Sequence, residues 1–134
     1  MKKIFIILGL ILFTSSVHAE VVQSQPAQNP ATVSQNIAFE DCTKIFGLNQ
    51  EKLFYITLAS ISANRFKVEE IQSSNGYIIF SANRNKYLAT VGKVDDKNAI
   101  LKITPCNNIY NFPPGVISNV FKYIDINATT DIKI

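Results

Sequence analysis

Apolar residues recur along the chain at two spacings, one typical of helices and one of strands. Between Asn49 and Asn64, the side chains of Leu53, Leu58 and Ile61 fall on one broad side of a helical wheel. Asn49 is a favourable N-cap residue. The pattern predicts an amphipathic helix that ends near Asn64.

Three turn signals divide the following stretch, residues 67–103, into strands. Asn75-Gly76 suits a two-residue type I′ turn, Asn83-Arg84-Asn85 a three-residue hairpin, and Asp95–Asn98 a four-residue loop. Each turn fixes a register, and the faces then agree across four strands. The predicted pairs are Ile71 with Phe80, Gln72 with Ile79, Phe80 with Leu88, and Val94 with Ala99.

These registers sort the strand residues into two faces, because neighbouring strand residues point to opposite sides. The predicted core face comprises Ile71, Ile78, Phe80, Ala82, Leu88, Thr90, Val94, Ala99, Leu101 and Ile103. The other face comprises Val68, Tyr77, Ile79, Tyr87, Ala89, Val91 and Ile100, diluted by Gln72, Ser81, Lys93 and Lys102. Either the terminal segments or the second helix cover this second face, or it is an exposed contact surface.

Two further helices are expected beside the meander. Residues 38–46 carry apolar side chains at helical spacing, which predicts a short helix before Gly47. Pro113-Pro114-Gly115 opens a second amphipathic segment that includes Val116 and Val120. The predicted fold class is therefore α+β: helix, four-stranded antiparallel meander, helix, with the helices packed on one sheet face. Residues 38–126 form a single domain, and residues 127–134 form a tail.

The N-terminus has the pattern of a secretory signal peptide. Residues 1–19 combine two lysines, an apolar run and small residues before a cleavage site after Ala19. An uncleaved membrane anchor is the alternative, although the apolar run is short for a span. Residues 20–37 are rich in Gln, Ser, Ala, Asn and Pro, which predicts a flexible segment. The protein is expected to be exported, to a bacterial periplasm or beyond.

Export would change the chemistry that the chain can perform. Lys2 and Lys3 are two of the 13 basic residues, so 11 remain against 10 acidic ones, and the only histidine, His18, is removed. A chain without histidine lacks the side chain best suited to proton transfer and zinc binding near neutral pH. No catalytic residue, metal site or cofactor is expected, and the small net charge argues against a nucleic-acid partner.

Two clusters of charged residues were weighed for chemistry. Glu69 and Glu70 are expected to point to opposite faces of a strand, so they cannot act as a catalytic pair. Arg65, Lys67, Arg84 and Lys86 could gather at one end of the sheet, near Tyr87. Such a cluster could bind a nucleic acid or an anionic glycan, but a small basic patch on a nearly neutral domain is usually a solvated rim.

Cys42 and Cys106 are the only cysteines. In an exported chain they predict one disulfide, and two buried thiols are the alternative.

Part of the chain resembles small bacterial cell-envelope domains of the helix-grip type, including domains of the C component of the β-barrel assembly machinery. The similarity covers residues 51–103 and rests on the step "NRFKVEEI" after the long helix and on the element Gly76-Tyr77-Ile78. This resemblance implies a scaffold or accessory role and transfers no functional residue. The lipid-attachment cysteine of such lipoproteins is absent here.

The function predicted from these observations is a non-enzymatic accessory or protein-interaction module of the cell envelope. A carrier of a small apolar ligand between helix and sheet is an alternative. An inhibitor of an exported enzyme, inserting residues 107–112, is another. The predicted partner-binding residues are Tyr77, Ile79, Tyr87, Val91, Ile100 and Lys102.

Overall fold

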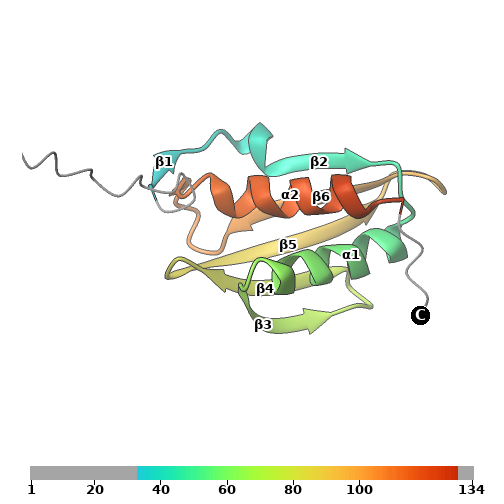
Figure 1. The fold of residues 1–134 in the computed structure, drawn as a ribbon, viewed down its shortest axis with the longest axis horizontal. Helices are drawn as coiled ribbons and strands as arrows, with labels where there is room; N and C mark the ends of the chain where they lie inside the picture. The colour runs from blue at the N-terminus through green and yellow to red at the C-terminus, as the bar shows by residue number, and fades with distance from the viewer. Residues whose placement is uncertain (1–32, 130–134) are drawn as a thin grey trace, which may run out of the picture.

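The computed structural model describes residues 33–129. The predicted signal peptide, residues 20–32 of the predicted flexible segment and residues 130–134 of the tail lie outside this range. The described chain contains two α-helices, a five-stranded antiparallel sheet and a two-stranded sheet, so the α+β class is confirmed (Figure 1). The elements in chain order are β1 (Gln35–Asn36), η1 (Phe39–Cys42), β2 (Thr43–Phe46), α1 (Gln50–Ala63), β3 (Lys67–Gln72), β4 (Tyr77–Ala82), β5 (Asn85–Lys93), β6 (Ala99–Pro105), β7 (Asn111–Phe112) and α2 (Gly115–Asn127).

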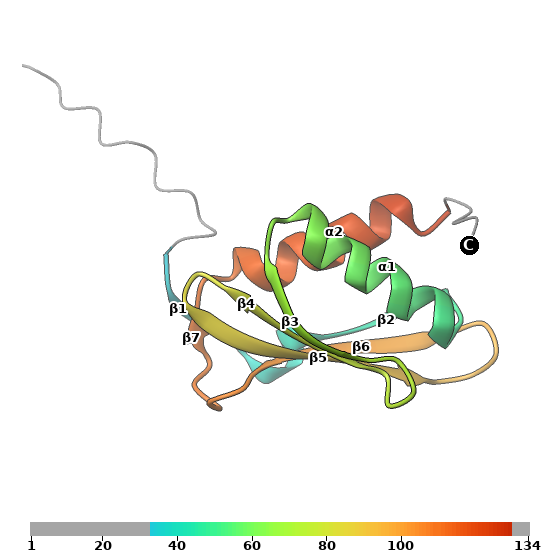
Figure 2. The ribbon, with the colours of Figure 1, turned by 90° about the horizontal axis from the view of Figure 1, so that it is seen from below.

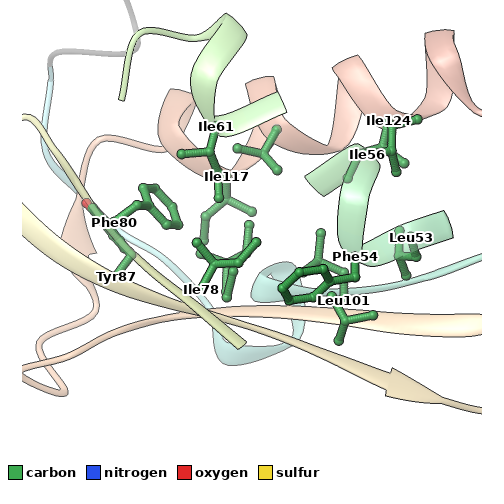
Figure 3. Packing of buried hydrophobic residues seen from close by; sticks show 14 of the residues in the cluster. Leu53, Phe54, Ile56, Ile61, Ile78, Phe80, Tyr87, Leu101, Ile117 and Ile124 are labelled. Carbon is green, nitrogen blue, oxygen red and sulfur yellow. The ribbon is translucent and has the colours of Figure 1, made fainter. Parts of the chain in front are cut away.

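Both helices lie on the same face of the large sheet (Figure 2). The strand order is β2-β6-β5-β4-β3, so the four-stranded meander β3–β6 is extended at its β6 edge by β2. Figure 3 shows the apolar side chains of α1 and α2 packed against Ile78, Phe80 and Leu101 of the sheet, all three fully buried.

The long helix forms as its sequence predicts. The Asn49 side chain accepts a hydrogen bond from the Lys52 backbone N–H at 2.8 Å and so caps the first turn of α1. Ser60 Oγ donates to the Val120 carbonyl of α2 at 3.2 Å, which joins the two helices where their small residues allow close approach. The second helix is confirmed too, with Val116, Val120 and Ile124 fully buried.

The predicted helix over residues 38–46 is wrong. Phe39–Cys42 form one 3-10 turn, and Thr43–Phe46 form β2, which pairs with β6. Phe46 is buried whereas Ile45 is 57% exposed, as expected for a strand with one face against the core. Strand pairing with the open edge of β6 outweighed the local helical spacing.

The small sheet ties the N-terminal side of the described chain to the segment before α2. Gln35 pairs with Phe112, and the Ile37 N–H donates to the Tyr110 carbonyl at 2.8 Å. The described fold therefore includes residues that the sequence prediction placed before the domain.

All three hairpin connections differ in length from the prediction. The β3–β4 turn spans residues 73–76, so Ile71 pairs with Ile78 instead of Phe80. The β4–β5 turn is the two-residue Asn83-Arg84, so Phe80 pairs with Tyr87 instead of Leu88. The β5–β6 loop spans residues 94–98, so Lys93, not Val94, pairs with Ala99.

The second of these differences reverses the faces of β5. Because a one-residue slip turns every side chain of a strand over, Tyr87, Ala89 and Val91 are buried in the core, while Leu88 and Thr90 point away from it. The β5–β6 loop is one residue longer than predicted, whereas the β4–β5 turn is one residue shorter, so the two errors cancel for β6. Ala99, Leu101 and Ile103 therefore remain core residues as predicted.

Cys42 and Cys106 are not bonded, so the predicted disulfide is wrong. Thr43 pairs with Lys102, which places the adjacent Cys42 beside the middle of β6, whereas Cys106 follows the end of that strand. Three residues of extended strand span ~10 Å, which exceeds the ~7 Å between Cα atoms that a disulfide tolerates. Cys42 is fully buried and Cys106 is exposed, so only part of the two-thiol alternative holds.

Candidate functional site

The candidate site is the outer face, the side of the large sheet that points away from α1 and α2 (Figure 2). Its members alternate with the core residues along each strand and lie side by side through the strand registers. The outer face comprises Thr43, Ile45, Lys67, Glu70, Gln72, Tyr77, Ile79, Ser81, Lys86, Leu88, Thr90, Gly92, Ile100, Lys102 and Thr104.

Apolar side chains occupy the middle of the outer face. Ile79 pairs with Leu88 across β4 and β5, and both side chains are half-buried by their neighbours. Ile45 pairs with Ile100 across β2 and β6 in a second apolar row. Between these rows lies a mixed row in which Thr90 has Tyr77 and Lys102 as its two neighbours. The face therefore combines aliphatic, aromatic and lysine side chains on one surface.

Four of the six predicted partner-binding residues lie on this face: Tyr77, Ile79, Ile100 and Lys102. Tyr87 and Val91 do not, because both are buried under the helices. The sequence reasoning missed Leu88, which it assigned to the core, and Ile45, which it placed in a helix. Recognition of Asn83-Arg84 as a two-residue turn would have found Leu88, because that turn alone reverses β5.

A β-bulge brings both glutamates of β3 to the outer face. The register shifts between Val68 and Glu70, which leaves Glu69 as an extra residue in the strand. Glu69 accepts a hydrogen bond from Ser81 Oγ at 2.9 Å, and Glu70 accepts one from the Tyr77 hydroxyl at 2.7 Å. The expectation that the two carboxylates point to opposite faces is therefore wrong, since bulges break the alternation on which it depended.

These carboxylates are held by donors on the same face. The Ser81 hydroxyl and the Lys67 ammonium, 3.3 Å from Glu69 Oε1, lower the pKa of Glu69. The hydrogen bond to Glu70 raises the pKa of Tyr77. At neutral pH Glu69 is thus a charged acceptor, and Tyr77 is a neutral donor fixed in orientation. This arrangement suits the recognition of a surface better than proton transfer, which needs a carboxyl that can carry the proton.

An aromatic rim borders the outer face near β6. The Lys102 ammonium lies 4.4 Å from the centre of the Phe39 ring in η1, and that ring lies 6.0 Å from the ring of Tyr110. A cation held against an aromatic ring loses part of its freedom. Lys102 is therefore a positioned charge beside the apolar rows.

The space between helix and sheet is filled by side chains in the region shown in Figure 3. A groove of about 360 Å³ opens instead at the start of α1, where Gln50, Glu51 and Tyr55 face Ser73 and Ser74. Its lining is largely polar, unlike the site of an apolar ligand. Residues 107–112, proposed as an inserting loop, end in β7, where Phe112 is buried.

Other kinds of site would require grouped metal ligands or a long apolar helix. Residues 33–129 contain no group of three or more metal-ligating side chains close enough to share an ion. Within the same range, neither helix has the length and apolarity needed to cross a bilayer.

Neither models of known protein families nor curated proteins give a match to the sequence.

Proposed function

We propose that this protein is a non-enzymatic interaction module that binds another protein through the outer face. The observation that carries the proposal is the pair of apolar rows, Ile79 with Leu88 and Ile45 with Ile100, on a face that neither α1 nor α2 covers. Apolar side chains gathered on one surface tend to mark contact sites. The positioned Tyr77 and Lys102 would supply the directional contacts at such an interface.

The role in the cell that we propose is an accessory one in the bacterial envelope. Its support comes from the signal-peptide pattern of residues 1–19 and from the resemblance of residues 51–103 to helix-grip envelope domains. A partner in the periplasm or at a membrane-associated assembly would be consistent with the signal-peptide pattern and with the resemblance.

The proposal is tested by removing the central apolar row without disturbing the sheet. The double variant Ile79→Thr/Leu88→Thr places a β-branched residue at both strand positions and removes the apolar contact. We expect the unchanged protein to capture a specific partner from envelope extract, and the double variant to bind that purified partner at least ~10-fold more weakly. Ile126→Thr is the matched control, because Ile126 is 65% exposed on α2 and lies outside the outer face.

Circular dichroism and the unfolding midpoint should show that both variants remain folded. Equal binding by the double variant and the unchanged protein would exclude the Ile79–Leu88 row as the contact site. Loss of binding in the Ile126→Thr control would place the contact on the helices instead.

A further inference from the structure

One end of the large sheet collects basic side chains, and two of them, Lys67 and Lys86, also belong to the outer face. This basic end comprises Arg65 in the α1–β3 connection, Lys67 at the start of β3, Arg84 in the β4–β5 turn and Lys86 near the start of β5. Lys67 and Lys86 are both register partners of Ser81, so they flank it on adjacent strands. The two connections lie at the same end of the molecule (Figures 1 and 2).

Arg65 occupies a backbone position where glycine is usual. It follows the C-cap residue Asn64 and has φ 60°. Its N–H donates to the Ser62 carbonyl at 3.0 Å, and the Phe66 N–H donates to the Ile61 carbonyl at 3.1 Å. This pair of bonds is the Schellman motif, whose left-handed residue is most often glycine because it has no Cβ.

Arg84 occupies a second position of this kind. Asn83 and Arg84 have φ 48° and 68° and form the two-residue β4–β5 turn. Asparagine followed by glycine is the preferred sequence for such a turn. The chain has the expected asparagine, and arginine stands where glycine would cost less strain.

Neither arginine has an internal role that would offset this strain. Within the described residues, neither Arg65 nor Arg84 takes part in an ion pair or a side-chain hydrogen bond. Among residues 33–129, one ion pair is found at the basic end: Lys67 lies 3.3 Å from Glu69, and the Lys67 side chain is 75% exposed. Two arginines in strained turns at one end, free of internal partners, indicate an external anion.

A large exposed apolar side chain lies in the loop that follows β6, at the same end of the sheet. The Cys106 N–H donates to the Lys86 carbonyl at 2.9 Å, so the loop after β6 begins next to the basic end. Ile109 in this loop is 59% exposed, and Asn107 Oδ1 accepts from the Ile109 N–H at 3.0 Å, which holds the loop in shape. Cations and an exposed aliphatic residue at one end of a molecule suit a lipid surface, where the charges meet headgroups and the apolar side chain enters the interface.

We propose that the basic end binds the surface of a membrane rich in anionic phospholipid. Arg65 and Arg84 contact phosphate groups of the lipids. Lys67 and Lys86 increase the positive electrostatic potential of this end, and Ile109 enters the headgroup layer. The contact would hold the molecule by one end and leave the two apolar rows of the outer face accessible to a protein.

The test is co-sedimentation of the full chain with vesicles of equimolar phosphatidylcholine and phosphatidylglycerol, or of phosphatidylcholine alone. The neutral vesicles account for binding through apolar segments such as residues 4–13. We expect stronger binding to the anionic vesicles, weakened by added NaCl. Arg65→Gln/Arg84→Gln should bind them about 30-fold more weakly, roughly 1 kcal/mol for each arginine. The matched control Lys97→Gln/Lys122→Gln removes the same charge elsewhere and should bind as the unchanged protein does.

A second pair of variants separates binding from structure. Arg65→Gly/Arg84→Gly should also lose binding, yet raise the Tm by a few degrees because glycine relieves both strained turns. The inference is wrong if neutral and anionic vesicles bind equally, if the arginine variants bind like the control, or if soluble glycerol phosphate at matched phosphate concentration displaces the vesicles. None of these results depends on protein capture by the outer face, so the two proposals can fail separately.

Discussion

Tyr87 combines favourable ring packing with a buried hydroxyl that lowers the free energy of unfolding. Its ring stacks on Phe80 at 5.4 Å and meets Phe112 edge-on at 5.3 Å, so the ring is well packed. Its hydroxyl, however, is buried and has no hydrogen-bond partner within the described residues. Burial raises the pKa of Tyr87, and the nearby Asn85 side chain opposes this increase only in part. An unpaired buried hydroxyl costs free energy that the packing of the ring must offset.

We therefore predict that Tyr87→Phe stabilises the protein, by about 1 kcal/mol in the free energy of unfolding. The variant keeps the ring contacts and removes the unpaired oxygen. Urea unfolding followed by circular dichroism measures this difference in the free energy of unfolding. Tyr87→Ser, which also removes the ring, should instead destabilise the protein by about 3 kcal/mol or more. A less stable Tyr87→Phe protein would mean that the hydroxyl does have a partner in the folded chain.

The same measurement over a range of pH supplies a second readout. Above about pH 10 the unfolded chain releases the Tyr87 proton while the folded chain retains it. Proton release then favours the unfolded state, so the free energy of unfolding of the unchanged protein falls as the pH rises. Tyr87→Phe lacks this contribution, so its advantage should grow between about pH 10 and 11. A constant difference across that range would show that burial does not perturb Tyr87.

The turns, more than the strands, decide which side chains reach the core. The β3–β4 turn depends on Gly76, which has φ 68° and whose carbonyl accepts from the Val91 N–H of β5 at 2.7 Å. A Cβ at this position would lie 2.6 Å from the Val91 carbonyl oxygen. Only glycine combines this backbone conformation with so close an approach.

Gly76→Ala should accordingly lower the free energy of unfolding by about 1–3 kcal/mol. Gly47→Ala is the matched control, because a Cβ there meets nothing within 4 Å, and it should change stability by less than ~0.5 kcal/mol. Thermal unfolding of both variants provides the comparison. Equal stability of the two would mean that the β3–β4 turn can move away from β5 at little cost.

The elements that local signals define were predictable, and those that depend on distant strands were not. The cap at Asn49 and the apolar spacing of α1 and α2 are properties of short segments, so both helices were found. The two-residue turn at Asn83-Arg84 was not recognised, because arginine stands where glycine would have identified it. Neither β2 nor the bulge at Glu69 has a local signature, since each exists only through its pairing with β6 or β4.

The candidate outer face was predicted in part for the same reason. Tyr77 and Ile79 on β4 and Ile100 and Lys102 on β6 were placed correctly, because two opposite one-residue errors cancelled between those strands. Only β5, which lies between the two errors, was predicted with its faces reversed. Tyr87 and Val91 were therefore assigned to the outer face, where Leu88 lies instead.

At the scale of the whole molecule, β2 and α2 bring together the two ends of the described chain. Lys44 of β2 lies 2.6 Å from Asp125 near the end of α2, which links strand and helix across the sheet edge. Cys42, between η1 and β2, is fully buried, and its Sγ lies 3.6 Å from the Ala38 carbonyl. Cys42 can thus meet a reagent in solution only when this junction opens.

Thiol labelling should therefore report on the unfolding of the whole domain. In the native protein one thiol, the exposed Cys106, should react first with an aromatic disulfide reagent, although partial burial raises its pKa. Cys42 should react slowly, because burial and then the charges of Asp41 and Glu40 raise its pKa and reduce its reactive thiolate. If β2 opens only with the core, and the reagent is concentrated enough that labelling outpaces refolding, the slow rate should equal the global unfolding rate measured by circular dichroism. A slow phase much faster than global unfolding would show that η1 and β2 detach alone, and the absence of free thiols before reduction would restore the disulfide.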